Sequence, residues 1–337
     1  MPQKTIGEYS EFTLIDQITK KFADLKKRGT IINIGDDGAV FSSKLHTAHV
    51  TSIDSFVENV HWDSRKTNFY DIGWKSVNAA VSDIAAMGSK GTYITIACNL
   101  KNDMLHVEFI KLINGIHDAC VKLKISVIGG NLSNSKTTTI TVTAMGTMPT
   151  KNNHILSMQR NKAHIGDKII VSGQIGGAGA GFQLSKKKDI DEKKLLQIFH
   201  KPHARTDIAE RLAYSGVQCA IDISDGLLQD LLHICHASQV NATIHREQIP
   251  LFKESIKIFG LLQAQEIALT AGEDYELLFT ANDTVIKKIK RKKIPFYIIG
   301  TIDSKKIEKK AVNISLVNDK NITKITKNSG WEHFGHE

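Results

Sequence analysis

The side chains of this chain that could do chemistry are carboxylates, and they gather in five short segments that each follow an apolar run. The segments are IGDDGA with Asp36 and Asp37, TSIDS with Asp54, VSDIAAMG with Asp83, IDISDGL with Asp222 and Asp225, and AGEDYELLF with Glu273 and Asp274. Brought together they would repel, because two unit charges about 4 Å apart cost ~4 kcal/mol even at an effective dielectric constant of about 20. Oxygen ligands without His or Cys are typical of magnesium, so the pattern predicts a site for Mg²⁺ or a similar ion.

Each segment also has a simpler interpretation, because Asp beside Gly or Ser is the commonest turn chemistry. The IDISDGL segment is harder to explain as a turn. Its two aspartates lie three residues apart beside a strand-like run, and Gly226 with Leu227 marks the entry of a helix. Five such segments in one chain favour a site that binds metal and phosphate.

A phosphate-binding enzyme often carries a Walker loop, but this chain has no GxxxxGK[ST] motif and no GxGxxG after a strand. The nearest feature is GQIGGAGAG at Gly173–Gly181, between IIVSG and an apolar helix. Its amides could bind a phosphate at the helix N-terminus. The interpretation we prefer is close packing of helix and strand through small residues.

Length and composition describe an ordinary globular protein. At roughly 150 residues a domain, 337 residues predict two domains, and 41% hydrophobic with 23% charged residues is a common mixture. No apolar run approaches the ~18–20 residues of a membrane span, and the N-terminus lacks the apolar core of a signal peptide. Four cysteines without CxxC or metal-type spacing predict reduced, structural thiols in a cytoplasmic protein.

The net charge of +9 and the pI of about 9.2 raise the possibility of a nucleic-acid partner. The basic residues form short runs at Lys186–Lys188 and Lys287–Lys293. No helix-turn-helix, zinc-finger or RNA-recognition signature accompanies them, so we expect no nucleic-acid partner. A solvated helix face, or a positive field that steers anionic substrates, explains the same charge.

The apolar pattern predicts the elements that must position the carboxylates. The sequence predicts a strand at Thr47–Ile53, and runs rich in β-branched residues predict strands at Thr92–Ala97 and Thr138–Met145. Helical periodicity predicts helices at Ser10–Leu25, at Asp71–Met87 with Asp71 as N-cap, and at Met104–Leu123. A polar stretch at Met148–Asn153 predicts a linker, after which GDKIIVSG opens a second α/β unit. The expected domains are therefore residues 1–150 and 151–337.

In this order, the segments resemble the thiamine-monophosphate kinase family, of the superfamily that includes aminoimidazole-ribonucleotide synthetase and selenophosphate synthetase. The resemblance covers about residues 7 to 334 and rests on GEYSEFTLI, IGDDGAV, SIDSFVENVHW, DIGWKSVNAAVSDIAAMG, VIGGN, QRNKAHIGDKIIVSG, IDISDGLLQDLLHI, AGEDYELLFT and GWEHF. It implies an α/β (α+β) fold of two domains, with an N-terminal sheet domain that binds metal and ATP and forms a homodimer. A C-terminal α/β domain would complete the active-site cleft.

The same resemblance implies transfer of the ATP γ-phosphoryl group onto thiamine monophosphate, with several Mg²⁺ ions in the site. It also implies roles for individual residues. The magnesium ligands would be Asp37, Ser52, Asp54, Asp83, Asn131, Asp222 and Asp225. The nucleotide contacts would be Gly130, Asn131, Arg160 and Ser224, and the substrate contacts would be His61, Glu273 and Trp331. No side chain is assigned as a general base. His61 and Trp331 also have structural interpretations, as a buried histidine and as an aromatic residue that seals the second core.

The chain departs from the family pattern at three positions. The family usually has GGD-T where this chain has Gly129-Gly130-Asn131-Leu132, so an amide replaces a carboxylate. Ile53 replaces a Thr, and Ala80 replaces an Asn. An amide oxygen still ligates magnesium, but it brings no charge; alternatively, Asn131 only shapes the Gly129–Gly130 turn.

Two rival functions remain open from the sequence. One is another phosphotransferase or ATP-dependent ligase of the superfamily. Selenophosphate synthetase would carry an early Cys near a Lys, and no Cys precedes Cys98. The other is a non-catalytic nucleotide-binding relative, which Asn131 and the basic balance would favour.

Overall fold

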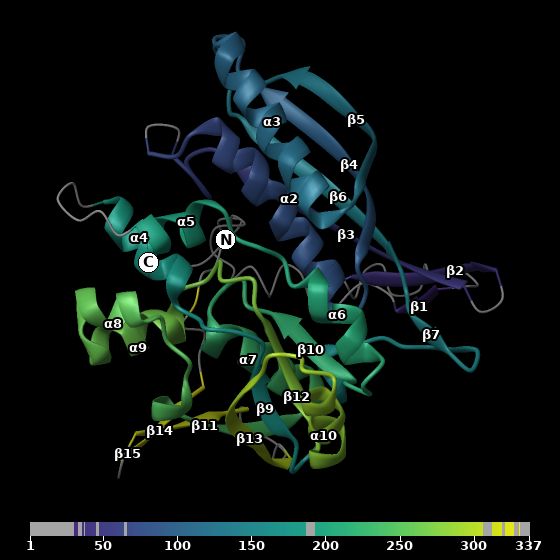
Figure 1. The fold of residues 1–337 in the computed structure, drawn as a ribbon, viewed down its shortest axis with the longest axis vertical. Coiled ribbons are helices and arrows are strands. Elements are labelled where there is room, and N and C mark those ends of the chain that lie inside the picture. Colours follow the sequence, from purple (N-terminus) through teal and green to yellow (C-terminus); the bar gives the residue numbers. More distant parts are fainter. Residues whose placement is uncertain are drawn as a thin grey trace, which may run out of the picture.

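The computed structural model describes residues 30–32, 36, 38–44, 47–63, 66–186, 193–305, 312–318, 321–326 and 330. The predictions for Ser10–Leu25, Asp37 and Trp331 lie outside these residues. The described chain forms two mixed α/β halves, each built on its own sheet (Figure 1). The predicted α/β class is confirmed. No helix within these residues has the length and apolar character of a membrane span.

The first sheet has the strand order β1-β2-β3-β6-β4-β5. Its strands are β1 (Thr30–Ile32), β2 (Ala39–Lys44), β3 (Thr47–Val57), β4 (Gly91–Leu100), β5 (Ser126–Asn134) and β6 (Thr139–Thr147). Neighbours are antiparallel except β4 and β5, which are parallel. A parallel pair needs a crossover connection, and the helix α3 (His106–Leu123) supplies it.

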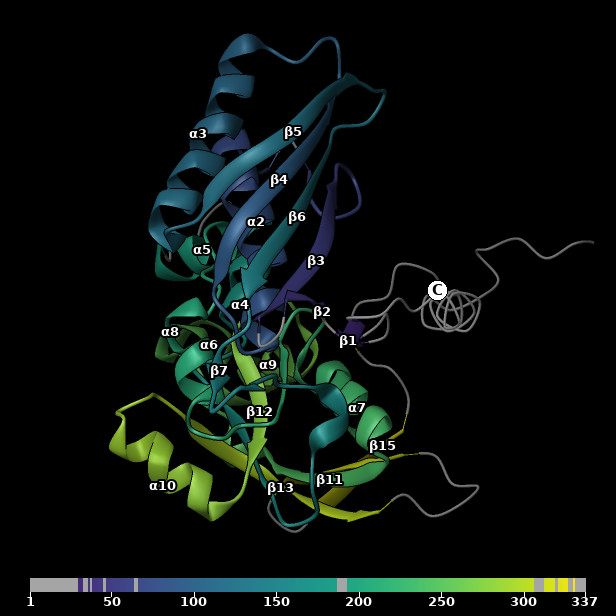
Figure 2. The same ribbon diagram turned by 90° about the vertical axis from the view of Figure 1, so that its right-hand side faces the viewer.

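The helices α2 (Phe69–Ala86) and α3 cover one face of this sheet (Figure 2). Side chains alternate between the two faces of a strand, and β6 follows that rule. Its Ile140, Val142 and Ala144 are fully buried against the helices, whereas the threonines between them are partly exposed. The other face is therefore open in a single copy of the described chain.

The helix α2 begins one turn earlier than the sequence predicted. Asn68, not Asp71, is the N-cap: its side chain accepts the N–H of Asp71 at 3.0 Å and donates to the Asp71 carboxylate at 2.6 Å. Asp71 instead lies in the first turn, where a negative charge is favourable beside the helix N-terminus.

The second sheet has the order β10-β12-β9-β13-β11-β14-β15. Its strands are β9 (Lys168–Val171), β10 (Cys219–Asp222), β11 (Val240–His245), β12 (Leu277–Ala281), β13 (Tyr297–Lys305), β14 (Ile314–Asn318) and β15 (Asn321–Ile325). The helix α7 (Leu227–Ser238) packs on one face, and α6 (Thr206–Ala213) with α10 (Asp283–Arg291) packs on the other. With both faces covered, all five residues of β12 are buried.

The remaining elements complete the second half. The helices α4 (Gly177–Ser185), α5 (Lys193–His200), α8 (Lys253–Phe259) and α9 (Leu261–Thr270) share a smaller apolar cluster. The stretch predicted as a linker instead holds part of a hairpin, β7 (Thr150–Lys151) and β8 (His154–Ile155). All four cysteines are buried and free, as predicted.

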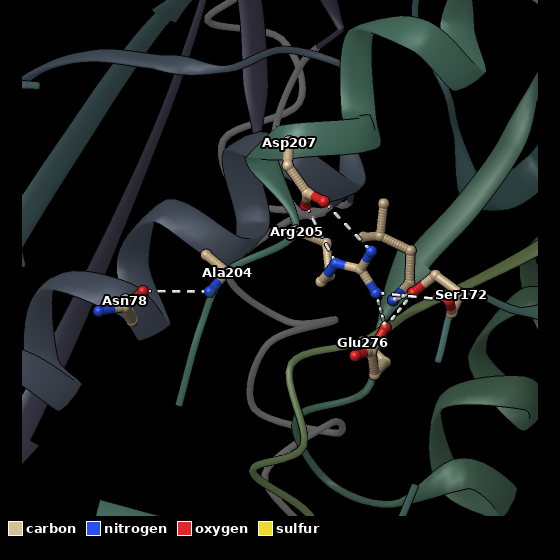
Figure 3. Close-up of polar contacts among 7 residues, drawn as sticks. Asn78, Ser172, Ala204, Arg205, Asp207 and Glu276 are labelled. Atoms are coloured by element: carbon tan, nitrogen blue, oxygen red, sulfur yellow. Dashed lines mark hydrogen bonds and ion pairs between the residues drawn. The ribbon is translucent and has the colours of Figure 1, made fainter. Parts of the chain in front are cut away.

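The two halves meet along α2. Its last residues, Ala85 and Ala86, belong to the core that α6 and α10 share. The segment before α6 is hydrogen-bonded to the same helix: Trp74 donates to the Pro202 carbonyl at 2.7 Å, and Ala204 N–H donates to Asn78 at 3.0 Å (Figure 3). These contacts join the two halves.

Candidate active site

Ser52 and Asp54 lie on the helix-covered face of β3. They share that face with Val50 and Phe56, which are 0% and 4% exposed, whereas Ile53 is 64% exposed on the opposite face. The Ser52 hydroxyl donates to the Asp83 carboxylate of α2 at 2.5 Å. The strand and the helix therefore bring together three predicted residues. The departure at Ile53 does not touch the acidic group, because its side chain points to the open face.

Asp222 and Asp225 are positioned by the turn between β10 and α7. Gly226 has φ +125°, which favours glycine, and begins the helix. The Asp230 carboxylate accepts the backbone N–H of Asp225 at 3.2 Å and that of Gly226 at 3.1 Å. Asp230 is 1% exposed, so it fixes the turn from inside. Burial, followed by the charges of Asp225 and Asp222, raises the pKa of Asp230 well above its usual value.

A second loop, residues 271–276, pairs with this turn. Glu273 N–H donates to the Ser224 carbonyl at 2.8 Å, and Tyr275 N–H donates to the Ile223 carbonyl at 2.9 Å. A Cβ on Gly272 would lie 1.9 Å from the Ser224 carbonyl oxygen, so the approach is open only to glycine. Glu273 and Tyr275 have φ of +67° and +50°, which is strained for residues with a side chain. Such strain persists only where the surroundings hold the backbone.

Tyr275 shows that carboxylates from both halves converge. Its side chain is 5% exposed and packs in the core of the first half. Its pKa is raised well above the usual value by burial first, and then by the charges of Glu273, Asp54, Asp222 and Asp225. One hydroxyl therefore experiences the field of β3, of the turn after β10 and of the 271–276 loop. We call the carboxylates Asp54, Asp83, Asp222, Asp225 and Asp230 the acidic group.

Two cations border the acidic group. Arg160 Nε lies 3.8 Å from the Asp36 carboxylate, and the charge of Arg160 opposes the upward shift of the Asp230 pKa. Lys75 on α2 donates to Glu273 at 2.6 Å, with only 5% of its side chain exposed. The region thus combines many carboxylates with two fixed positive groups.

A network of polar side chains, which is only partly buried, holds Glu276 at the end of the 271–276 loop (Figure 3). Arg205 donates to Glu276 at 2.5 Å and to Asp207 at 3.0 Å, and Ser172 donates to Glu276 as well. Burial raises the pKa of Glu276, and the Arg205 charge and these hydrogen bonds oppose that shift. The network links the loop to the segment that binds α2.

The glycine-rich segment at Gly173–Gly181 is a packing feature. Asp274 accepts the N–H of Gly176 at 2.5 Å and that of Ala178 at 3.0 Å, so the chain's own carboxylate occupies the start of α4. A Cβ on Gly179 would lie 2.3 Å from the Ala271 side chain. The preferred packing interpretation is therefore supported. Burial raises the Asp274 pKa to about 7, against the opposing effect of these backbone hydrogen bonds.

The structure separates some of the other predicted residues from the acidic group. Asn131 is level with Ala97, Thr141 and Ser55 across β4, β6 and β3, so three strand spacings of roughly 4.8 Å put it about 14 Å from Ser55. It shares the open face with Ser55, opposite to Ser52 and Asp54. Gly130 precedes it on the same edge strand. In a single copy of the chain, Asn131 cannot share an ion with Asp54.

His61 follows β3, and its orientation is fixed. Its ring stacks on Phe56 with centroids 5.4 Å apart, and Nδ1 accepts the Val57 N–H at 3.0 Å. The proton of the neutral ring is then on Nε2, which is a donor. Trp331 and Asp37 lie outside the described residues. Gly330 lies against the turn between β10 and α7, since a Cβ on Gly330 would be 2.5 Å from the Asp225 carbonyl oxygen.

Sequence reasoning missed Lys75, Asp230 and Tyr275. Lys75 stands in an amphipathic helix, where a lysine is normally a surface residue. Asp230 lies in the first turn of α7, five residues after Asp225. An acidic residue at that position could have been predicted to accept the backbone N–H groups at the start of the helix. Tyr275 gave no signal of its own, because its importance lies in contacts with distant segments.

The residues present fit magnesium. Asp54, Asp83, Asp222 and Asp225 offer carboxylate oxygens and Ser52 a hydroxyl, which are hard donors of the kind this ion prefers. Side-chain ligand atoms of Asp225, Asp230 and His233 all lie within 4.8 Å of one another. Burial, followed by the charges of neighbouring carboxylates, raises the pKa of Asp230 and of Tyr275, and a bound dication would offset those charges.

Comparisons with known proteins agree with this geometry. Residues 35–148 match the model for the AIR synthase related protein, N-terminal domain, and residues 164–312 match that for its C-terminal domain. Thiamine-monophosphate kinase of Buchnera aphidicola subsp. Schizaphis graminum is 35% identical over 97% of this chain and 99% of that protein. The Haemophilus influenzae protein of the same name is 32% identical over 90% and 92%.

A solved structure described as AaThiL complexed with AMPPCP and TMP superposes with a TM-score of 0.83 at 28% identity. The match covers 99% of this chain and 100% of that one. The two sheets, the acidic group and these full-length similarities lead to one conclusion: the chain belongs to the thiamine-monophosphate kinase family.

Proposed function

We propose that this chain transfers the γ-phosphoryl group of ATP to the phosphate of thiamine monophosphate, giving thiamine diphosphate. The names of its relatives and the ligands of the related structure support that reaction. The observation that carries the proposal is the convergence of carboxylates from both halves around Tyr275. An enzyme that joins two anions needs such a group to hold the cations that offset their repulsion.

The acceptor needs little activation, because the second pKa of a phosphate is about 6 and the nucleophilic oxygen is already ionised near neutral pH. This agrees with His61, whose Nδ1 already accepts a backbone N–H and whose Nε2 is a donor rather than a base. The raised pKa of Tyr275 keeps that hydroxyl protonated as well. The remaining work is positioning and charge stabilisation.

The magnesium ligands in this proposal are Asp37, Ser52, Asp54, Asp83, Asp222 and Asp225. Magnesium, when bound, neutralises phosphate charge and aligns the attacking and leaving oxygens. Arg160 would contact phosphate oxygens through its planar guanidinium group, and Ser224 would contact the nucleotide. Glu273, His61 and Trp331 would bind the thiamine monophosphate, with Trp331 adding a cation–π contribution of ~0.5–2 kcal/mol from the thiazolium ring.

A homodimer formed through the open face of the first sheet is part of the proposal. Ile53 and Tyr93 lie on this face and are 64% and 46% exposed. Exposed apolar side chains on a sheet face are typical of an interaction surface. Asn131 shares the face. Gly130 and Asn131 would therefore contact a nucleotide that is bound to a second copy of the chain. A cytoplasmic location stays a prediction from the sequence.

A transfer assay tests the proposal. The purified protein is incubated with magnesium and ATP labelled at the γ-phosphate, with thiamine monophosphate, thiamine or aminoimidazole ribonucleotide as acceptor. We expect labelled thiamine diphosphate, little reaction with thiamine, and no product without magnesium. Robust phosphorylation of free thiamine with none of the monophosphate would contradict the proposal. Turnover of aminoimidazole ribonucleotide alone would favour the other branch of the superfamily.

A further inference from the structure

Lys75 places a buried ammonium group beside the acidic group, where no motif predicted one. The residue is 4% exposed, which is rare for a lysine unless it is paired. Its Nζ donates to the Glu273 carboxylate at 2.6 Å and lies 4.1 Å from the centroid of the Phe199 ring. Contacts on two sides therefore fix the position of the charge.

The backbone of Glu273, whose side chain contacts this ammonium group, is fixed in position by its own hydrogen bond. Its φ is +67°, and its N–H is bonded to the Ser224 carbonyl. The carboxylate is close enough to Tyr275 to raise the pKa of that hydroxyl, together with Asp54 and the two aspartates of the β10–α7 turn. Glu273 thus lies at the border of the acidic group while it is paired with a cation from the other half of the molecule.

The charges around Glu273 explain why such a pair is useful. An unpaired glutamate carboxylate at this border would be repelled by the acidic group, or would compete for its metal ions. A charge-assisted hydrogen bond to a buried ammonium group holds the carboxylate in one place. The aromatic ring of Phe199 in turn stabilises the ammonium group.

We propose that Lys75 is a positioning residue that holds the Glu273 carboxylate for the thiamine end of the acceptor and keeps it away from the magnesium ligands. The inference rests on the proposed function and deepens it. Lys75 acts through Glu273 and belongs to acceptor recognition rather than to nucleotide binding. A tether that only joined the two halves would instead affect stability and the two substrates alike.

Four proteins test the inference: Lys75→Met, Lys75→Arg, Glu273→Gln and the double variant Lys75→Met/Glu273→Gln. We expect Lys75→Met to raise KM for thiamine monophosphate at least about tenfold, which corresponds to about 1.4 kcal/mol. KM for ATP should change by less than about twofold, since Lys75 contacts Glu273 and Phe199, neither of which is assigned to the nucleotide. Lys75→Arg should recover most of the loss, because it keeps the charge. The double variant should be no worse than Lys75→Met, since the two residues act as a unit.

Lys101→Met is the matched control. Lys101 Nζ lies 2.8 Å from Glu58, whose side chain is 3% exposed, so this variant also breaks an ion pair with a buried glutamate. It should lower the melting temperature and leave both KM values unchanged. If Lys75→Met leaves KM for thiamine monophosphate unchanged, or if the effects of Lys75→Met and Glu273→Gln multiply, Lys75 does not position Glu273. An unmodified protein that does not phosphorylate thiamine monophosphate would instead overturn the proposed function.

Discussion

Like charges at Asp54, Asp222 and Asp225 act on the same buried hydroxyl, Tyr275. In the metal-free protein these charges are a source of strain. Repulsion among them disfavours the ionised state, and each carboxylate that is removed relieves part of it. The residues that would hold magnesium are therefore expected to cost the metal-free fold some stability, as is common at functional sites.

Asp54→Ala tests this expectation. We expect turnover to fall by at least about three orders of magnitude. Several metal ions would share a small number of ligands, so the loss of one carboxylate would impair their binding. The melting temperature without metal should stay the same or rise, because a partly buried like charge is lost. Asp103→Ala, at an exposed turn after β4, is the control and should change neither quantity. Activity of Asp54→Ala that returns fully at saturating magnesium would show that Asp54 is not a ligand.

At the scale of secondary structure, two short loops, 222–226 and 271–276, form the centre of the site. They are held together by backbone hydrogen bonds from Glu273 and Tyr275, beyond the ends of the paired strands β10 and β12. Asp230 fixes the first loop and Asp274 anchors the second to α4. The spacing of the loops is therefore set by backbone contacts, and Gly272 is the point of closest approach.

Gly272→Ala should destabilise the protein by about 1–3 kcal/mol or more, because its Cβ would meet a backbone oxygen that cannot move away without breaking the loop pairing. Urea unfolding measures the change. Gly129→Ala is the control, since the nearest atom to its Cβ would be 3.8 Å away, on the Thr95 side chain. That variant should unfold within about 0.5 kcal/mol of the parent. Equal stability of the two alanine variants would mean that the loops are not in such close contact.

At the scale of the whole molecule, the halves share one site but differ in how they are covered. The second sheet has helices on both faces, whereas the described helices cover only one face of the first. The open face therefore distinguishes the two halves, and the apolar side chains on it are the reason to expect a partner. A second copy of the chain would cover it and bring Asn131 near another protein surface.

Ile53→Lys should shift the protein from dimer to monomer in sedimentation analysis, because a lysine at the centre of a buried apolar interface is costly. Leu262→Lys is the control: Leu262 is 69% exposed on α9, away from the open face, and the variant should stay dimeric. The fold of both should persist, since neither side chain is buried in one copy. A parent protein that sediments as a monomer at micromolar concentration would rule out the proposed dimer.

Local patterns in the sequence determined much of the fold. A run of β-branched residues predicted Thr138–Met145 as a strand, and β6 is Thr139–Thr147. Helical periodicity predicted Met104–Leu123, and α3 is His106–Leu123. The first succeeded because β-branched side chains pack well on a pleated sheet, and the second because a helix with one buried face repeats its apolar residues at the helical period. The cap of α2 was misassigned because Asn68 and Asp71 both suit an N-cap, and only their reciprocal hydrogen bonds distinguish them.

The motifs also predicted chemistry, since the oxygen-rich segments by themselves indicated a magnesium and phosphate site. Only the tertiary structure decided how those segments meet. Lys75 and Glu273 are 198 residues apart in the chain, and no periodicity relates them. The strand register aligned Asn131 with Ser55 and so put it on the face opposite to Asp54, and β4 and β6 separate the two strands. Side-chain type is a property of the sequence, whereas the face and the neighbours of a side chain depend on long-range strand pairing and packing, which no local pattern encodes.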